Sequence, residues 1–184
     1  MGQGEPLLNL ENVIKAIKII NESLIIGMRR ITLSTSGVVP QIYRLAEEDF
    51  PITLALSLHA PTHELRKTII PIEEKYPVDE VIKAVDHYTK ATSRRLTIEY
   101  TVIAGINDSI DDAKTLAALI KNIHCNVNFI AYNPACSDKF KKPGIETLNM
   151  FKYILELSGK KVTVRLERGA DIAASCGQLS GMVL

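Results

Sequence analysis

Short apolar segments alternate with longer segments of helical periodicity along the whole chain, and this alternation limits the fold more than any other feature. The apolar segments lie at residues 31–34, 52–58, 96–103, 126–131 and 162–166. Between them, apolar side chains recur every three or four residues, which predicts helices. The expected helices run from Asn9 through Ile20 and lie near 40–48, 62–67, 78–90, 109–122 and 145–158. Strands separated by helices are typical of βαβ units, in which the strands are parallel.

The order of these segments predicts an α/β fold with one parallel sheet. The turn Gly4-Glu5-Pro6 opens the chain, and because turns of this kind normally follow a strand, we expect another strand ahead of Met1. The spacing favours a partial (βα) barrel of the TIM type that lacks its first strand or strands, and a doubly wound sheet is the alternative. We expect one domain over residues 1–184 with a tail at 167–184, and self-association through the exposed edge of the sheet.

Composition excludes several classes of protein. Apolar residues make up 46% of the chain and charged residues 23%, which indicates a globular fold, and a net charge of +1 gives no broad basic surface for nucleic acid. The three cysteines, Cys125, Cys136 and Cys176, form no C-x-x-C pair, and their odd number argues against a disulfide framework. No segment reaches the roughly 18 apolar residues of a membrane-spanning helix. We therefore expect a cytoplasmic protein without a membrane partner.

Polar residues follow the predicted strands, and in parallel barrels the carboxyl ends of the strands carry the active site. Glu5 suits an ammonium group or a metal, or a cap for the next helix. Ser34 begins a turn rich in hydroxyl groups that suits a carboxylate or phosphate, or that only ends the strand. His59 could act as a general base, a metal ligand or a hydrogen-bond donor to a cofactor, or it could be a buried structural residue. Pro134 biases Asn133 toward an extended backbone. The Asn133 amide could hydrogen-bond the edge of a ligand ring, or the residue could only form a turn.

Cys176 lies among small residues, in the sequence ASCGQ at 174–178. Small neighbours leave a thiol uncrowded, as a nucleophile requires. A free cysteine is more often a small buried hydrophobic residue, so both interpretations stay open on the residues alone.

Several segments of the chain, in this order, resemble those of one enzyme family. They are GEPLLNLENV, RRITLSTSGVVP, LALSLHAP with ELRK two residues later, IPIEEKYP, IEY, IAYNP and the tail from RGADI to CGQL. The set extends over nearly all of residues 3–181. It resembles the radical S-adenosylmethionine (SAM) RNA methyltransferases, which methylate carbon 2 of an adenine in 23S ribosomal RNA and in some transfer RNAs. The related methylase of carbon 8 of the same base shares much of this pattern and is the alternative.

The resemblance implies a set of SAM-binding residues at the strand ends. These are Gly4, Glu5, Ser34, Ser57, Leu58, His59 and Asn133. Gly4 and Glu5 would contact the methionyl amino group of SAM, and Asn133 would contact its adenine end. Cys176, in the tail, would be the catalytic cysteine, which accepts a methyl group from one SAM and forms a transient link to the RNA base.

The chain departs from this family because it lacks the C-x-x-x-C-x-x-C motif that holds a [4Fe–4S] cluster, and its own cysteines are too far apart to replace it. The family's second catalytic cysteine and its amino-terminal RNA-binding domain are also missing. We therefore expect the carboxy-terminal part of such a methyltransferase, without metal ligands and inactive in isolation, whose intact form modifies 23S rRNA and tRNA. The alternatives are a non-catalytic SAM- or RNA-binding remnant, a product without a ligand, and a barrel hydrolase that uses Glu5 and His59.

Overall fold

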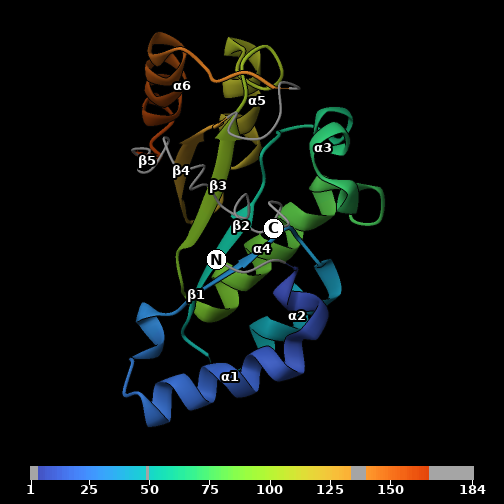
Figure 1. Ribbon diagram of the computed structural model, residues 1–184, viewed down its shortest axis with the longest axis vertical. Helices are drawn as coiled ribbons and strands as arrows, with labels where there is room; N and C mark the ends of the chain where they lie inside the picture. Colours follow the sequence, from blue (N-terminus) through green and yellow to red (C-terminus); the bar gives the residue numbers. More distant parts are fainter. Residues whose placement is uncertain (1–3, 49, 134–139, 166–184) are drawn as a thin grey trace, which may run out of the picture.

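The computed structural model describes residues 4–48, 50–133 and 140–165, and its strands form one parallel sheet in the order of the sequence (Figure 1). The strands are β1 Thr32–Thr35, β2 Thr53–Ser57, β3 Leu96–Val102, β4 Cys125–Ala131 and β5 Lys161–Arg165. A parallel sheet whose strands follow in sequence order, with helical crossovers between them, is an arc of a (βα) barrel. The predicted α/β fold is confirmed. The reversal of strand order that defines a doubly wound sheet does not occur among the described strands.

Helices fill the connections between the strands. The α-helices of the described residues are α1 Leu10–Ser23, α2 Val39–Glu47, α3 His63–Ile69, α4 Val78–Thr92, α5 Ile110–Leu119 and α6 Ile145–Leu157. Short 3-10 helices lie at η1 Pro6–Asn9, η2 Met28–Arg30 and η3 Pro71–Glu74. The strands and α-helices match the predicted positions to within a few residues. The 3-10 helices were not predicted, because segments of three or four residues are too short to show a periodicity.

Local hydrogen bonds explain where individual helices begin and end. The Ser109 hydroxyl accepts from the backbone N–H of Asp112 at 3.0 Å, and the Asp112 carboxylate accepts from the backbone N–H of Ser109 at 3.1 Å, so a capping box starts α5. Gly159 follows α6 with a φ of +81°, a left-handed conformation that suits glycine. Asn9 precedes α1 as predicted, but its side-chain oxygen accepts from the Asn12 amide at 2.7 Å and makes no capping bond to the backbone.

The two faces of the sheet differ in polarity. Along β3 the residues alternate between fully buried side chains, such as Tyr100, and half-buried polar side chains, such as Glu99. The buried face packs against helices: the rings of Tyr100, Phe129 and Phe151 of α6 meet with centroids 5.3–6.0 Å apart. The opposite face carries the polar members of each strand, and it is the face that lines the inside of a barrel.

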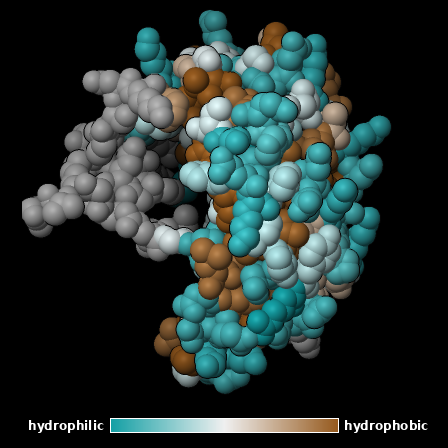
Figure 2. All heavy atoms as spheres, turned by 90° about the vertical axis from the view of Figure 1, so that its right-hand side faces the viewer, coloured by the Kyte–Doolittle hydropathy of each residue, from teal (hydrophilic) through white to brown (hydrophobic). Residues whose placement is uncertain are grey.

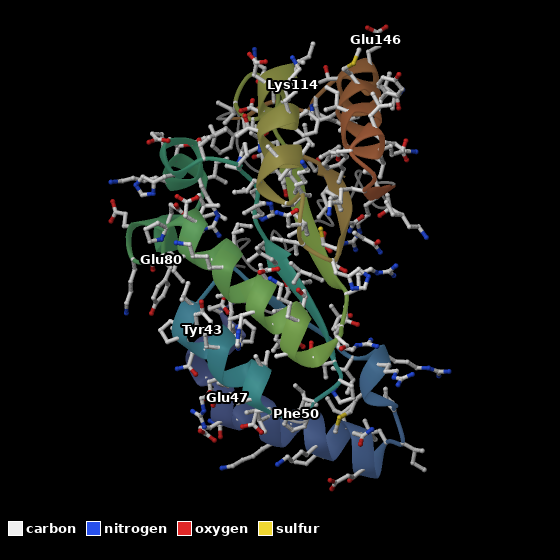
Figure 3. All side chains as sticks on the ribbon, turned by 180° about the vertical axis from the view of Figure 1, so that it is seen from behind. Tyr43, Glu47, Phe50, Glu80, Lys114 and Glu146 are labelled. Carbon is white, nitrogen blue, oxygen red and sulfur yellow. The ribbon has the colours of Figure 1, made fainter. Side chains whose placement is uncertain are left out.

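Helices α2 and α4 lie side by side on the outside of the sheet (Figure 1). Tyr43 of α2, labelled in Figure 3, contacts His87 of α4 with ring centroids 5.1 Å apart. The outer surface seen in Figure 2 is mainly hydrophilic, with apolar side chains scattered among polar ones, as is usual for the exposed faces of amphipathic helices. None of the helices in the described part of the chain combines the length and the apolar composition that crossing a membrane requires.

Substitution of Gly37 tests the close packing between the end of β1 and α4. Gly37 has a φ of +109°, and a Cβ at this position would lie 2.9 Å from both Cγ atoms of Val81. Backbone strain and overpacking both oppose a side chain here, so Gly37→Ala should lower the free energy of unfolding by about 2 to 4 kcal/mol. Gly159→Ala is the matched control, since its φ is also positive but no atom lies within 4 Å of the added Cβ.

The control should cost only about 1 kcal/mol, the strain of the left-handed backbone. Urea unfolding of both variants and of the parent chain gives the comparison. Equal losses for the two substitutions would contradict the packing of Gly37 against Val81.

Candidate functional site

Glu5 joins the opening turn to the end of β1 through four hydrogen bonds. Its Oε1 accepts from the backbone N–H of Leu7 at 3.0 Å and from the Thr35 hydroxyl at 2.8 Å. Its Oε2 accepts from the backbone N–H of Ser36 at 2.7 Å and from the Ser36 hydroxyl at 2.6 Å. A carboxylate offers about four acceptor positions, and all of them are occupied here. Glu5 therefore caps the short helix that begins at Pro6, as one of its two interpretations predicted. A ligand ammonium would have to displace one of these donors.

The other predicted residues at this edge lie next to these contacts. Gly4 precedes Glu5 with a φ of +103°, which glycine adopts readily. Ser34 is half-buried in β1, one residue before Thr35, and pairs in register with Ala55 of β2. The turn and the first strand end therefore form one hydrogen-bonded unit.

A buried arginine, which sequence reasoning missed, joins the ends of β1 and β2. Arg66 of α3 donates from Nε to the carbonyl of Leu58 at 2.9 Å. Its Nη2 donates to the carbonyl of Ser36 at 2.6 Å and to the carbonyl of Ser57 at 3.3 Å. Backbone carbonyls at the end of a sheet need such partners when they are removed from water. One guanidinium thus holds two strand ends in a fixed relation.

Glu73 of η3 balances the charge of this arginine. Both side chains are fully buried, and Arg66 Nη1 donates to Glu73 Oε2. The other oxygen, Oε1, accepts from the backbone N–H of Val78 at 2.7 Å and lies 2.9 Å from Nδ1 of His63. Removing one partner of a buried ion pair leaves an uncompensated charge in the interior. Nothing in the local sequence marks either residue, because arginine and glutamate are usually exposed.

His59 follows β2 with a φ of +58° and its ring is fixed by β3. Nδ1 accepts a hydrogen bond from the backbone N–H of Thr101 at 3.0 Å, so Nδ1 carries no proton and the neutral ring has its proton on Nε2. Burial, with a smaller contribution from the charge of Arg66, lowers the pKa of His59 from 6.5 to about 4. His59 is therefore a neutral ring that can donate a hydrogen bond through Nε2, and its predicted role as a donor to a cofactor stays a prediction.

Asn107 locks the loop after β3 against His59. This buried amide accepts from the backbone N–H of Ile103 at 2.7 Å and donates to the carbonyls of His59 and Thr101, both at 2.7 Å. The hydroxyl of Tyr100 donates to the Asn107 carbonyl at 2.9 Å. The turn-forming character of this loop was visible in the sequence, but its contact with a residue 48 positions earlier was not.

The remaining predicted residues are Asn133 and Cys176. Asn133 follows β4 at the same edge of the sheet and is half-buried, and its predicted contact with adenine stays a prediction. Cys176 lies outside the described residues, as does the rest of the tail 167–184. Cys125 is buried in β4, where burial raises the pKa of its thiol, which fits a structural residue. Within the described part of the chain, no group of three or more histidine, cysteine or acidic residues is placed to hold a metal ion.

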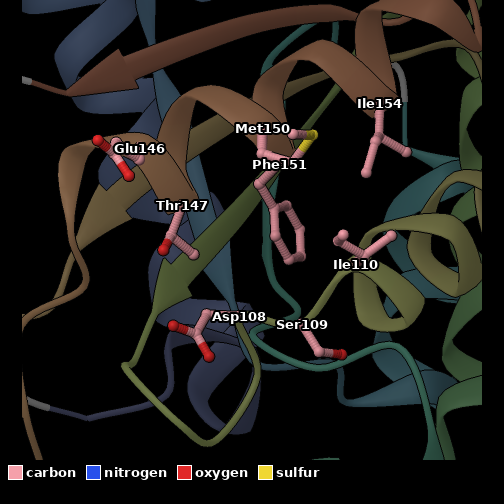
Figure 4. Close-up of a pocket in the computed structure, with 8 residues that line it drawn as sticks. All are labelled: Asp108, Ser109, Ile110, Glu146, Thr147, Met150, Phe151 and Ile154. Atoms are coloured by element: carbon pink, nitrogen blue, oxygen red, sulfur yellow. The ribbon is translucent and has the colours of Figure 1, made fainter.

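A cavity of about 360 Å³ lies between α6 and the segment that joins β3 to α5 (Figure 4). Asp108 and Ser109 border it on one side and Met150, Phe151 and Ile154 on the other. It contains none of the residues predicted to bind SAM, so the strand ends remain the candidate site.

Comparison with known proteins adds to this geometry. The family model described as "Radical SAM superfamily" matches residues 1–119. The probable dual-specificity RNA methyltransferase RlmN of Symbiobacterium thermophilum is 50% identical over 182 residues, which cover 97% of this chain and 49% of that protein. The RlmN of Thermotoga petrophila is 51% identical and is covered to 52%. The chain therefore spans about half the length of the curated relatives it matches.

Solved structures agree with this relationship. A radical SAM methyltransferase from Sphaerobacter thermophilus superposes with a TM-score of 0.92 at 46% identity, over 97% of this chain and 53% of that chain. SuiB from Streptococcus suis, solved bound to S-adenosylmethionine, has a TM-score of 0.62 at 16% identity, over 95% of this chain and 43% of its own. The second likeness concerns the fold alone.

Glu73→Gln tests the buried ion pair. The substitution keeps the shape of the side chain but leaves the Arg66 charge uncompensated, so the free energy of unfolding should fall by about 3 kcal/mol. The neighbouring Glu74→Gln is the matched control, because Glu74 is exposed and pairs with the exposed Lys67 at 3.1 Å. This control should cost less than about 1 kcal/mol. Urea unfolding measures both, and a loss at Glu73 no larger than at Glu74 would show that the pair does not hold the strand ends.

The lowered pKa of His59 predicts a pH dependence of stability. Between pH 6.5 and 4 the unfolded chain binds a proton at this ring and the folded chain does not, so stability should fall as the pH falls through this window. Between pH 7 and 4.5, the free energy of unfolding of the parent chain should fall by about 2 kcal/mol more than that of His59→Asn. Asparagine is chosen because it tolerates the left-handed backbone. Urea unfolding at the two pH values tests this, and parallel losses in the two proteins would contradict the buried neutral ring.

Proposed function

Because the chain belongs to the radical SAM superfamily, we propose that it binds S-adenosylmethionine at the carboxyl ends of its strands. The observation that carries this proposal is that the polar groups at the strand ends are hydrogen-bonded within the protein. Their carbonyls and the Glu5 carboxylate are already paired within the protein, and the Nε2 proton of His59 is held in position by Thr101. A site with fixed donors suits a polar nucleoside cofactor, because little ordering is needed when the ligand binds.

The residues that would contact SAM are those at this edge. They are Gly4, Glu5, Ser34, Ser57, Leu58, His59 and Asn133. Gly4 and Glu5 would lie near the methionyl amino group and Asn133 near the adenine. Within this set, His59 has the clearest chemistry, since its Nε2 can donate to an oxygen or a ring nitrogen of the cofactor.

We propose further that the intact protein methylates carbon 2 of an adenine in 23S rRNA and tRNA, as a cytoplasmic enzyme in which Cys176 accepts the methyl group. The support is the identity of about 50% with RlmN proteins over nearly the whole chain. Carbon 8 of the same base is the alternative target, and a non-catalytic SAM- or RNA-binding chain is the alternative role. We expect self-association at the β1 edge, because β1 is the first strand of the sheet in the described part of the chain.

The residues of this chain do not fit an iron–sulfur cluster. Such a cluster supplies the electron that cleaves SAM, and it is held by closely spaced cysteine thiolates. Cys125 is buried in β4, and the sequence holds no C-x-x-x-C-x-x-C motif. We therefore propose that this chain by itself binds SAM and transfers no methyl group.

Calorimetric titration of the iron-free chain with SAM tests the proposal. The parent chain should bind, and His59→Asn should weaken binding about tenfold, since a buried hydrogen bond to a ligand is worth about 1 to 1.5 kcal/mol. His87→Asn, an exposed histidine on α4, is the matched control and should bind as the parent does.

Absence of SAM binding by the folded parent chain would refute the proposed site. A second measurement addresses catalysis: after anaerobic treatment with iron and sulfide, the chain should show no cluster absorption and should not methylate 23S rRNA. Methyl transfer under these conditions would overturn the expectation that the chain is inactive alone.

A further inference from the structure

A row of polar side chains crosses the face of the sheet that lines the inside of the arc. Strand register places Ser57 of β2, Glu99 of β3, Asn128 of β4 and Thr163 of β5 next to one another. Neighbouring strands lie about 4.8 Å apart, so adjacent members of the row are within reach of one another. Because Ser57 ends β2 and belongs to the proposed cofactor site, the row extends that site onto the sheet.

Hydrogen bonds give this row a direction. The Thr163 hydroxyl donates to Oδ1 of Asn128 at 3.1 Å, with the carbonyl of Val127 as a longer second acceptor at 3.5 Å. The Asn128 amide nitrogen then donates to Oε2 of Glu99 at 2.9 Å. The carboxylate is therefore the acceptor at the end of the chain of donors, and its orientation is set by its neighbour.

The second oxygen of this carboxylate keeps its capacity to accept. Among the described residues, no hydrogen bond reaches Oε1 of Glu99. Glu5 is the opposite case, because four donors from the protein fill its acceptor positions. Of these two carboxylates, Glu99 is the one that can take a new donor without losing an existing one.

The surroundings of Glu99 favour a cation. Burial raises the pKa of this carboxyl, and the hydrogen bond from Asn128 and the charge of Arg165 oppose the rise. Arg165 pairs in register with Ile130 of β4, two residues beyond Asn128, so it lies nearer the carboxyl edge of the sheet. A partly buried carboxylate is unfavourable as an anion unless positive charge or donors approach it, and a cationic ligand on this face would supply both.

We propose that Glu99 is a ligand-binding residue whose carboxylate contacts the positively charged part of SAM, with Asn128 as the residue that positions it. This inference rests on the proposed function, since it needs SAM at the strand ends. SAM carries positive charge on its amino group and on its sulfonium sulfur, and either group would be attracted to Glu99.

The experiment compares binding of SAM and of S-adenosylhomocysteine, which keeps the ammonium but has an uncharged sulfur. Glu99→Gln keeps the size and the acceptor oxygen but removes the charge, and it should weaken SAM binding about tenfold, as expected for a charge-assisted contact. If binding of S-adenosylhomocysteine weakens equally, Glu99 contacts the ammonium; if only SAM binding weakens, it contacts the sulfonium. Glu80→Gln, an exposed glutamate on α4, is the charge-matched control and should bind both compounds as the parent does.

A second variant guards against loss of folding. Asn128→Ala removes the positioning donor without changing a charge and should weaken SAM binding about threefold. Asn128→Gln keeps an amide donor and should bind SAM more tightly than Asn128→Ala. Unchanged SAM binding by folded Glu99→Gln would overturn the inference while leaving the proposed function intact. A parent chain that binds neither compound would overturn both.

Discussion

A single buried guanidinium holds the site together. Arg66 reaches the carbonyls of Ser36, Ser57 and Leu58 and meets the carboxylate of Glu73. At the end of a strand, the hydrogen bonds to the neighbouring strand stop. The backbone carbonyls there therefore need another donor. Since Ser36 also donates to Glu5, and Leu58 immediately precedes His59, the position of the arginine determines where the candidate ligand groups lie.

The consequence is a site whose structural polar groups are paired before any ligand binds. The Glu5 carboxylate accepts hydrogen bonds from protein donors, and the Asn107 amide bonds to backbone groups. Nδ1 of His59 accepts from the backbone N–H of Thr101. Within the described part of the chain, Nε2 of His59 and Oε1 of Glu99 have no hydrogen-bond partner, so each can bind a ligand. A donor and an anion that are fixed in advance lose little freedom on binding, and this favours a polar, cationic nucleoside over an apolar ligand.

Much of this architecture could be predicted from the sequence, because periodicity reports the burial of a strand or helix directly. The polar ends of the strands were also predicted, since turn residues there are local signals. The Arg66–Glu73 pair and the amide of Asn107 were not, because each depends on partners that only the folded sheet brings near, and a charged residue gives no sign that it will be buried. The specific roles of Gly4, Ser34 and Asn133 rest on family resemblance and stay predictions, as does that of Cys176.

We propose that the paired strand ends form a ready-made SAM site, which a crystal structure of the chain grown with SAM would reveal. We expect the cofactor at the carboxyl ends of β1 to β3, with Nε2 of His59 donating to it and with the Arg66–Glu73 pair unchanged. A cofactor bound elsewhere, or strand ends that must rearrange and release Arg66 to admit it, would refute this site.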